Sequence, residues 1–332
     1  MIAGSAAVGA AAAWNAWTRH GVGAYANPLG GTEGTYRWRG HRVAFTVHGA
    51  GAPLVLVHDV RESASSFEWR DVVDALGARF QVHAIDLLGF GRSARPAERY
   101  APRLYTSLLA DFAADVVAQP VALVAAGRAA AYAIDLAARD PARCPALVLV
   151  APVGLAPGER AVGVAGEARR AAVELPVVGT TLFNARVSRA AIRRRLERLY
   201  ADDRRVTESL VDHHFVVAHQ PGARHAPAAL LAGRLDLGVR GALRRLRQPA
   251  LLVWGEHAVE QPVDEARAFL AAKPDLEVAI LERAGDLPHE EQPSAFLDAV
   301  VPFLERHRAG AARAEASPTA TPRIQRAGTR RA

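Results

Sequence analysis

The chain has 332 residues, half of them hydrophobic, so it is long enough and apolar enough to form one large domain or a domain with an inserted cap. Its formal net charge is +7, but residues 309–332 hold five arginines against one glutamate, which leaves about +3 for the remainder and argues against a nucleic-acid partner. The single cysteine, Cys144, excludes an internal disulfide, and with Lys273 as the only lysine no Schiff-base chemistry is expected.

The chain begins with an alanine- and glycine-rich stretch, MIAGSAAVGAAAAWNAW, at residues 1–17. This pattern is weak for a signal peptide, because no basic residues precede the apolar run, and too thin for a transmembrane helix, which needs about 20 strongly apolar residues. A helix docked on the protein and a helix lying at a membrane surface fit it equally well. We therefore expect a separate segment at 1–31 and a cytoplasmic protein, with membrane association through residues 1–17 left open.

Short apolar runs bounded by turn residues then alternate with helical patterns. A hairpin is predicted where RVAFTVHG follows TYRWRG. Further strands are predicted at 53–58, 80–86, 120–125, 145–152, 249–256 and 276–285. Helices are predicted at 66–77, 103–118, 128–139, 262–273 and 291–307. This alternation predicts an α/β fold, a mostly parallel sheet with helices on both faces.

The interval 156–245 interrupts the alternation. It contains helical patterns, with VSRAAIRRRLERLYADD the clearest, and no good strand. A helical insertion between two core strands lies over the carboxyl edge of the sheet, where α/β proteins bind ligands. We therefore expect an α/β core at 32–155 and 246–308 and an inserted helical cap at 156–245. The remaining residues, 309–332, are rich in Ala, Arg, Pro and Thr and are predicted to be disordered.

Five motifs follow one another in a recognisable order. They are PLVLVHDVRESASSFEWRDVVDALGARFQVHAIDLLGFGRSARP (53–96), the turn at 125–129, PALVLVAPVG, QPALLVWGEH, and AGDLPHEEQPSAFLDAVVPFLE (284–305). In this order and spacing the chain resembles the α/β-hydrolase superfamily over residues 34–307. In particular it resembles the capped branch that includes haloalkane dehalogenases, carbon–carbon bond hydrolases and proline iminopeptidases. The resemblance implies an α/β-hydrolase fold with a site at the carboxyl edge of the sheet.

The chain departs from the family pattern at the positions that carry the chemistry. Gly127 stands at the elbow where the family has Ser or Asp, Ala258 where the acid follows Trp-Gly-Glu, and Asp286 in place of the histidine. Asp59 replaces the glycine after His58, and a carboxylate there would repel a developing oxyanion. Loss of a full triad costs on the order of 10⁶ in turnover. The resemblance therefore implies the family fold, and the departures from its pattern predict that the ordinary hydrolytic mechanism has been lost.

No replacement triad is evident. A structural role is favoured for His289, which lies where the family often has a second histidine at the start of the last helix, and His257 is expected at the pocket rim. The histidines of the cap show no recognised zinc spacing, so no metal and no cofactor are expected; they are His213, His214, His219 and His225.

The polar residues at the elbow suggest an ionic replacement for the triad. Two carboxylates, Asp59 and Asp286, would converge on a half-buried site and need a cation. Arg128, a planar five-donor group directly after the elbow, is the predicted partner, within salt-bridge distance of at least one of them. The pocket candidates are His58, Asp59, Arg128, His257, Asp286 and His289.

Three functional hypotheses follow from the sequence. The leading one is a non-hydrolytic protein, small-molecule-binding or scaffold, that keeps a pocket between cap and core for a small apolar or mixed-polarity ligand. The alternative is an active hydrolase or lyase that uses His289 or Asp286 as acid or base. The third is a membrane-associated interaction protein anchored by residues 1–17. The oligomeric state is not predicted.

Overall fold

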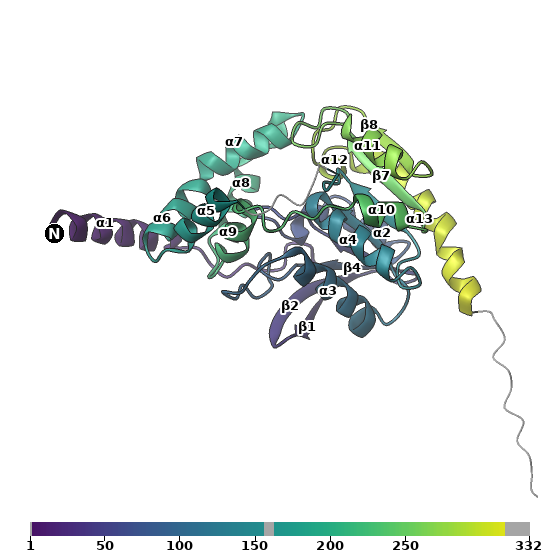
Figure 1. Ribbon diagram of the computed structural model, residues 1–332, viewed down its shortest axis with the longest axis horizontal. Helices are drawn as coiled ribbons and strands as arrows, with labels where there is room; N and C mark the ends of the chain where they lie inside the picture. Colours follow the sequence, from purple (N-terminus) through teal and green to yellow (C-terminus); the bar gives the residue numbers. More distant parts are fainter. Residues whose placement is uncertain (1, 156–162, 316–332) are drawn as a thin grey trace, which may run out of the picture.

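The computed structural model describes residues 2–155 and 163–315 (Figure 1). Eight strands form one sheet in the order β1-β2-β4-β3-β5-β6-β7-β8. They are β1 (Thr32–Trp38), β2 (His41–His48), β3 (Pro53–Val57), β4 (Gln81–Ile85), β5 (Ala122–Ala126), β6 (Leu147–Val150), β7 (Ala250–Gly255) and β8 (Glu277–Leu281). The hairpin β1–β2 and the β2–β4 pair are antiparallel, and every pairing from β4 to β8 is parallel. The predicted mostly parallel sheet is confirmed.

Helices cover both faces of this sheet, which explains why the central strands are continuous apolar runs. Successive residues of β3 face opposite cores: Val55 and Val57 pack in one, Leu54 and Leu56 in the other. The first core is covered by α3 (Pro102–Phe112), α4 (Gly127–Arg139) and α11 (Glu265–Ala272). The second is covered by η1 (Ser66–Trp69), α2 (Val73–Gly77) and α13 (Pro293–Glu315), and the short α12 (Pro288–Glu291) precedes α13.

The described residues between β6 and β7 form helices joined by turns and contain no strand. The cap helices, a name used here for α5 to α9, gather at one end of the molecule (Figure 1). They are α5 (Val164–Glu174), α6 (Val178–Arg186), α7 (Arg189–Leu199), α8 (Glu208–Ala218) and α9 (His225–Leu231). Phe183, Ile192 and Phe215 belong to a third apolar core beneath them. In contrast, α10 (Arg240–Arg245) packs on α4 and α11, and residues 156–162 lie outside the described part.

Both ends of the described chain are helical. α1 (Ile2–Arg19) packs against α6 and projects away from the body (Figure 1). No helix among the described residues is both long enough and apolar enough to cross a membrane. At the other end α13 continues to Glu315, so 309–315 are helical where disorder was expected, and 316–332 lie outside the described residues.

Candidate active-site region

Gly127 forms the sharp turn from β5 into α4, with a φ of +52°. This is the strand-to-helix elbow at which α/β-hydrolases carry their nucleophile. A Cβ placed on residue 127 would lie 2.1 Å from Oδ1 of Asp59 and 2.2 Å from its Cγ. With Asp59 in this position, the elbow has no room for a side chain.

The Asp59 carboxylate is held by two backbone amides. Oδ1 accepts hydrogen bonds from the amides of Val60 and Arg128, both at 2.7 Å. In α/β-hydrolases the oxyanion hole is built from the amide of the residue after the elbow and one amide from the loop after the third strand. Arg128 and Val60 are at those places. An anion that belongs to the chain itself therefore occupies the anion-binding amides.

Arg61 supplies the cation for this carboxylate. Its Nε lies 2.5 Å from Asp59 Oδ2, and its Nη1 lies 3.4 Å from Glu260. Burial by itself would raise the pKa of Asp59, but the Arg61 and Arg128 cations and the hydrogen bonds outweigh it, so that the pKa is lowered. Asp59 is 2% exposed and is thus a buried, paired anion.

The predicted salt bridge from Arg128 to Asp59 or Asp286 is wrong. The Arg128 guanidinium instead pairs with Asp236, with Nε 3.0 Å from Oδ1, and both side chains are about a third exposed. The physical reason is the start of α4. The first amides of a helix have no partner within the helix, so the backbone of Arg128 meets Asp59 while its side chain points elsewhere.

Asp286 has a different set of partners. Its buried carboxylate accepts hydrogen bonds from the amides of Val259 (2.9 Å), Glu260 (3.1 Å) and Gln261 (2.8 Å). It therefore fixes the loop after β7 to the loop after β8. Since Glu260 also contacts Arg61, a chain of contacts runs from Asp59 through Arg61 and Glu260 to Asp286.

Three further predicted positions lie around this chain. His58 is fully buried: its Nε2 accepts from the Leu87 amide at 3.0 Å, so its proton is on Nδ1, which donates to the Asp59 carbonyl at 2.6 Å. His257 is exposed, with its Nε2 3.7 Å from Oε2 of Glu256. Ala258 is half-buried and packs on the core.

His289 is fully buried between Trp69 and Phe296. Its Nε2 lies 3.5 Å from Glu68 Oε1, and within the described part of the chain neither ring nitrogen makes a hydrogen bond. The other oxygen of Glu68 accepts from the Asp59 amide at 3.1 Å. Glu68 therefore contacts both the His289 ring and the backbone of Asp59.

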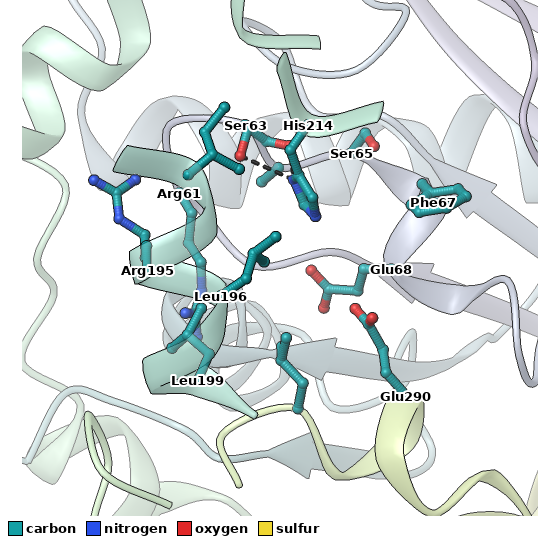
Figure 2. A pocket seen from close by; sticks show the side chains of 13 residues that line it. Arg61, Ser63, Ser65, Phe67, Glu68, Arg195, Leu196, Leu199, His214 and Glu290 are labelled. Atoms are coloured by element: carbon teal, nitrogen blue, oxygen red, sulfur yellow. Dashed lines mark hydrogen bonds between the residues drawn. The ribbon is translucent and has the colours of Figure 1, made fainter. Parts of the chain in front are cut away.

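A small cavity of about 40 Å³ lies between α7 and the loop after β3. Figure 2 shows the Glu68 and Glu290 carboxylates on one side of it and the α7 residues Leu196 and Leu199 on the other. Its lining residues are Arg61, Ser63, Ala64, Ser65, Phe67, Glu68, Ile192, Arg195, Leu196, Leu199, His214, Leu287 and Glu290. The volume admits a few water molecules, whereas ligand pockets usually measure about 300–1,000 Å³.

Several charged residues of the site are not among those that the sequence singles out. Arg61, Glu68 and Glu290 belong to them, and Glu290 is buried in a salt bridge to Arg70 at 2.6 Å. The available signal for Arg61 is its place two residues after Asp59, where a buried carboxylate needs a cation.

Comparison with known proteins places this geometry in context. The family model described as "Alpha/beta hydrolase family" matches residues 44–299. An uncharacterised protein of Mycobacterium tuberculosis is 25% identical, over 80% of this chain and 79% of its own length. A 2-hydroxy-6-oxo-6-(2'-aminophenyl)hexa-2,4-dienoic acid hydrolase of Metapseudomonas resinovorans is also 25% identical, over 81% of this chain and 89% of its own length. The solved structure of a serine hydrolase involved in carbazole degradation superposes with a TM-score of 0.69 at 23% identity, covering 83% of this chain and 99% of that one.

Proposed function

Because the chain belongs to the alpha/beta hydrolase family, we propose that it is a non-hydrolytic member of that family, in which the fold and cap serve as a scaffold. The observation that carries this proposal is the Asp59 carboxylate on the amides of Val60 and Arg128. Those amides stabilise the tetrahedral oxyanion in a working hydrolase.

The electrostatics oppose hydrolysis. A substrate oxyanion would have to displace Asp59 Oδ1 from both amides and then lie beside its negative charge. Loss of one oxyanion-hole donor alone costs about 10²–10³ in turnover, and here both donors are engaged. Gly127 adds no nucleophile, and the three amide hydrogen bonds to Asp286 support a structural role for that carboxylate.

The cavity supports a scaffold in preference to a binder of large ligands. At about 40 Å³ it has room for water or a very small molecule. A larger apolar or mixed-polarity ligand at this cavity would require the α7 side chains Leu196 and Leu199 to move.

The test is a combined labelling and turnover assay. We expect no fluorophosphonate labelling and no hydrolysis of short p-nitrophenyl esters or of 2-hydroxy-6-oxohexa-2,4-dienoic acids, the substrate class in the name of one relative. Gly127→Ser alone should not restore labelling. A rebuilt chain with Asp59→Gly, Gly127→Ser, Ala258→Asp and Asp286→His serves as the reference. Stoichiometric labelling of a core serine in the parent would contradict the proposal.

A second candidate is a hydrolase or lyase that uses His289. The observation that favours it is a buried imidazole beside Glu68 at the wall of the cavity, with no hydrogen bond among the described residues. This candidate requires a turnover that disappears in His289→Gln while the variant stays folded. Ligand binding without turnover would favour a non-hydrolytic binder of small molecules.

A further inference from the structure

Among the side chains that the structure describes, those that hydrogen-bond α1 to the cap lie in the last turns of the helix. Asn15 donates from Nδ2 to the Val177 carbonyl and to Thr181 Oγ1, both at 3.0 Å, and its Oδ1 accepts from Asn184 at 2.9 Å. Asn184 also donates to Thr18 Oγ1 at 3.0 Å. These buried polar contacts orient the helix, whose earlier residues project from the molecule (Figure 1).

The projecting part of α1 has an apolar composition that is unfavourable in water. Residues 2–17 include no charged side chain, and the polar Asn15 is turned into α6. Ala12, Ala13 and Ala16 are exposed, and Trp17 is 73% exposed. An isolated helix of this length is marginal in water, so α1 needs a further partner.

Large exposed apolar side chains gather where α1 meets the cap. Five of the eight that the described residues contain belong to α1, α5, α6 or the turn between α5 and α6; they are Trp17, Val164, Leu175, Val178 and Leu182. Val178 and Leu182 are four residues apart and therefore share one face of α6. We call Trp17, Leu175, Val178 and Leu182 the apolar rim. Such clusters mark interaction sites on soluble proteins.

Charge and size indicate what the apolar rim meets. Neither α1 nor α6 contains Asp or Glu, and the first acidic residue of the chain is Glu33, whereas the basic residues Arg19 and His20 follow two and three positions after Trp17. Aromatic and basic residues at the base of an apolar helix suit the headgroup level of a bilayer. Residues 2–13 extend about 18 Å, which reaches into one leaflet but cannot cross a hydrocarbon core of about 30 Å.

A groove at the base of α1 has the same mixed character. It measures about 390 Å³, and Trp14, Trp17 and Phe215 contribute aromatic walls. The Arg189 guanidinium lies 3.8 Å from the centre of the Phe215 ring and is paired with Asp212. The groove thus continues the aromatic surface from α1 onto α8.

We propose that α1 and the apolar rim dock the protein on the surface of an anionic phospholipid bilayer, with α1 entering one leaflet. Residues 2–14 of α1 contain one polar residue, Ser5, which is too few for a polar face, so this part of the helix enters the leaflet end-on and does not lie flat in the headgroup plane. The proposal is independent of whether the site around Asp59 is catalytic.

The test is vesicle flotation of the full chain. The assay compares three proteins: the parent, the double variant Trp17→Gln/Leu182→Gln and the matched control Val259→Gln. The vesicles are phosphatidylcholine, either alone or with roughly 30 mol% phosphatidylglycerol. Val259 is 60% exposed but lies after β7, far along the chain from the apolar rim. Circular dichroism checks that all three are folded, and size-exclusion chromatography with light scattering gives the mass without lipid.

The parent and Val259→Gln should float with the anionic vesicles, less with phosphatidylcholine alone, and less at high salt. The double variant should lose at least about tenfold in apparent affinity. Equal binding of the double variant, or failure of the parent to bind anionic vesicles, overturns the proposal. The proposal is also overturned if the parent is a dimer without lipid and the double variant is a monomer, because the apolar rim would then be covered by a second copy.

Discussion

The carboxylate of Asp59 lies where a side chain on Gly127 would begin, since a Cβ there would be 2.1 Å from Asp59 Oδ1. The two positions are therefore coupled. Residue 127 at the elbow is glycine, and the loop after the neighbouring strand β3 places the Asp59 carboxylate in the space that a side chain there would need. Sequence alignment alone treats them as two independent substitutions, but in space each one accommodates the other.

This coupling predicts a non-additive double-mutant cycle. Gly127→Ala should destabilise the fold by more than the roughly 1–3 kcal/mol expected for a non-glycine residue at a φ of +52°, because Asp59 must also move. In an Asp59→Gly background the clash is absent, so we expect an interaction free energy of at least about 1 kcal/mol. Urea unfolding of the parent, both single variants and the double variant measures it.

Gly40→Ala is the matched control for this cycle. Gly40 has a φ of +84° and nothing within 4 Å of an added Cβ, so it reports backbone strain without a clash. It should show no coupling to Asp59→Gly. If the free-energy changes of Gly127→Ala and Asp59→Gly were additive, as expected for Gly40→Ala and Asp59→Gly, the contact between positions 59 and 127 would not be significant in solution.

A second prediction separates two arginines that flank the same carboxylate. Arg61→Ala leaves Asp59 buried without its salt bridge and should cost roughly 3–5 kcal/mol of unfolding free energy. Arg128→Ala removes a partly exposed pair with Asp236 and a longer-range attraction to Asp59, but keeps the amide hydrogen bond to Asp59, so it should cost about 0–1 kcal/mol. Urea unfolding at pH 7 measures both, and a larger loss for Arg128→Ala would mean that its guanidinium, not that of Arg61, neutralises Asp59.

The difference between these arginines also marks the limit of the sequence analysis. Apolar runs such as those of β3 and β5 can be predicted, because parallel strands covered on both faces must be apolar throughout. The need of Asp59 for a cation can be predicted as well. Which arginine pairs with Asp59 depends on where the Arg128 side chain points from the first turn of α4. The amino-acid sequence does not determine that orientation.

Two further features depend on geometry that composition does not determine. The size of the cavity follows from how far Leu196 and Leu199 of α7 reach toward the core, which no motif specifies. The composition of residues 309–332 predicts disorder from Ala309 onward, including the stretch AGAARAE at 309–315. Residues 309–315 extend α13 instead, as alanine has the highest helix propensity.

A third prediction concerns strong acid. The pKa of Asp59 is lowered in the folded protein, so the unfolded chain binds the proton more readily. The stabilisation is fully present above the unfolded pKa of about 3.9 and is lost as the pH falls through the lower folded value. Asp59→Asn should therefore flatten the decline of unfolding free energy below about pH 4. Asp298→Asn, on an exposed position of α13, should leave that decline unchanged.

The last prediction concerns mild acid and the contact between α8 and the core. His213 stacks on Phe67 with ring centres 3.5 Å apart, and its Nε2 lies 3.1 Å from the Tyr25 hydroxyl. His214 Nδ1 lies 2.9 Å from Ser63 Oγ. Burial lowers the pKa of His213 to about 3, helped by His214 and Arg70, and lowers that of His214 to about 4 against the opposing effect of Glu290.

Each histidine is therefore protonated more readily in the unfolded chain, whose histidine pKa is about 6.5. Its contribution to stability is complete above that value and is lost as the pH falls toward the folded pKa, at roughly 1 kcal/mol per pH unit per histidine. We expect unfolding free energy to decline between pH 6.5 and 5, well above the carboxylate range. His213→Gln/His214→Gln should flatten this decline, and the exposed His257→Gln should not. Hydrogen exchange at pH 5.5 should locate the loss in α8, because protonation breaks its contacts with the core loop first; an unchanged slope in the double variant would show that these histidines are already solvated in the folded protein.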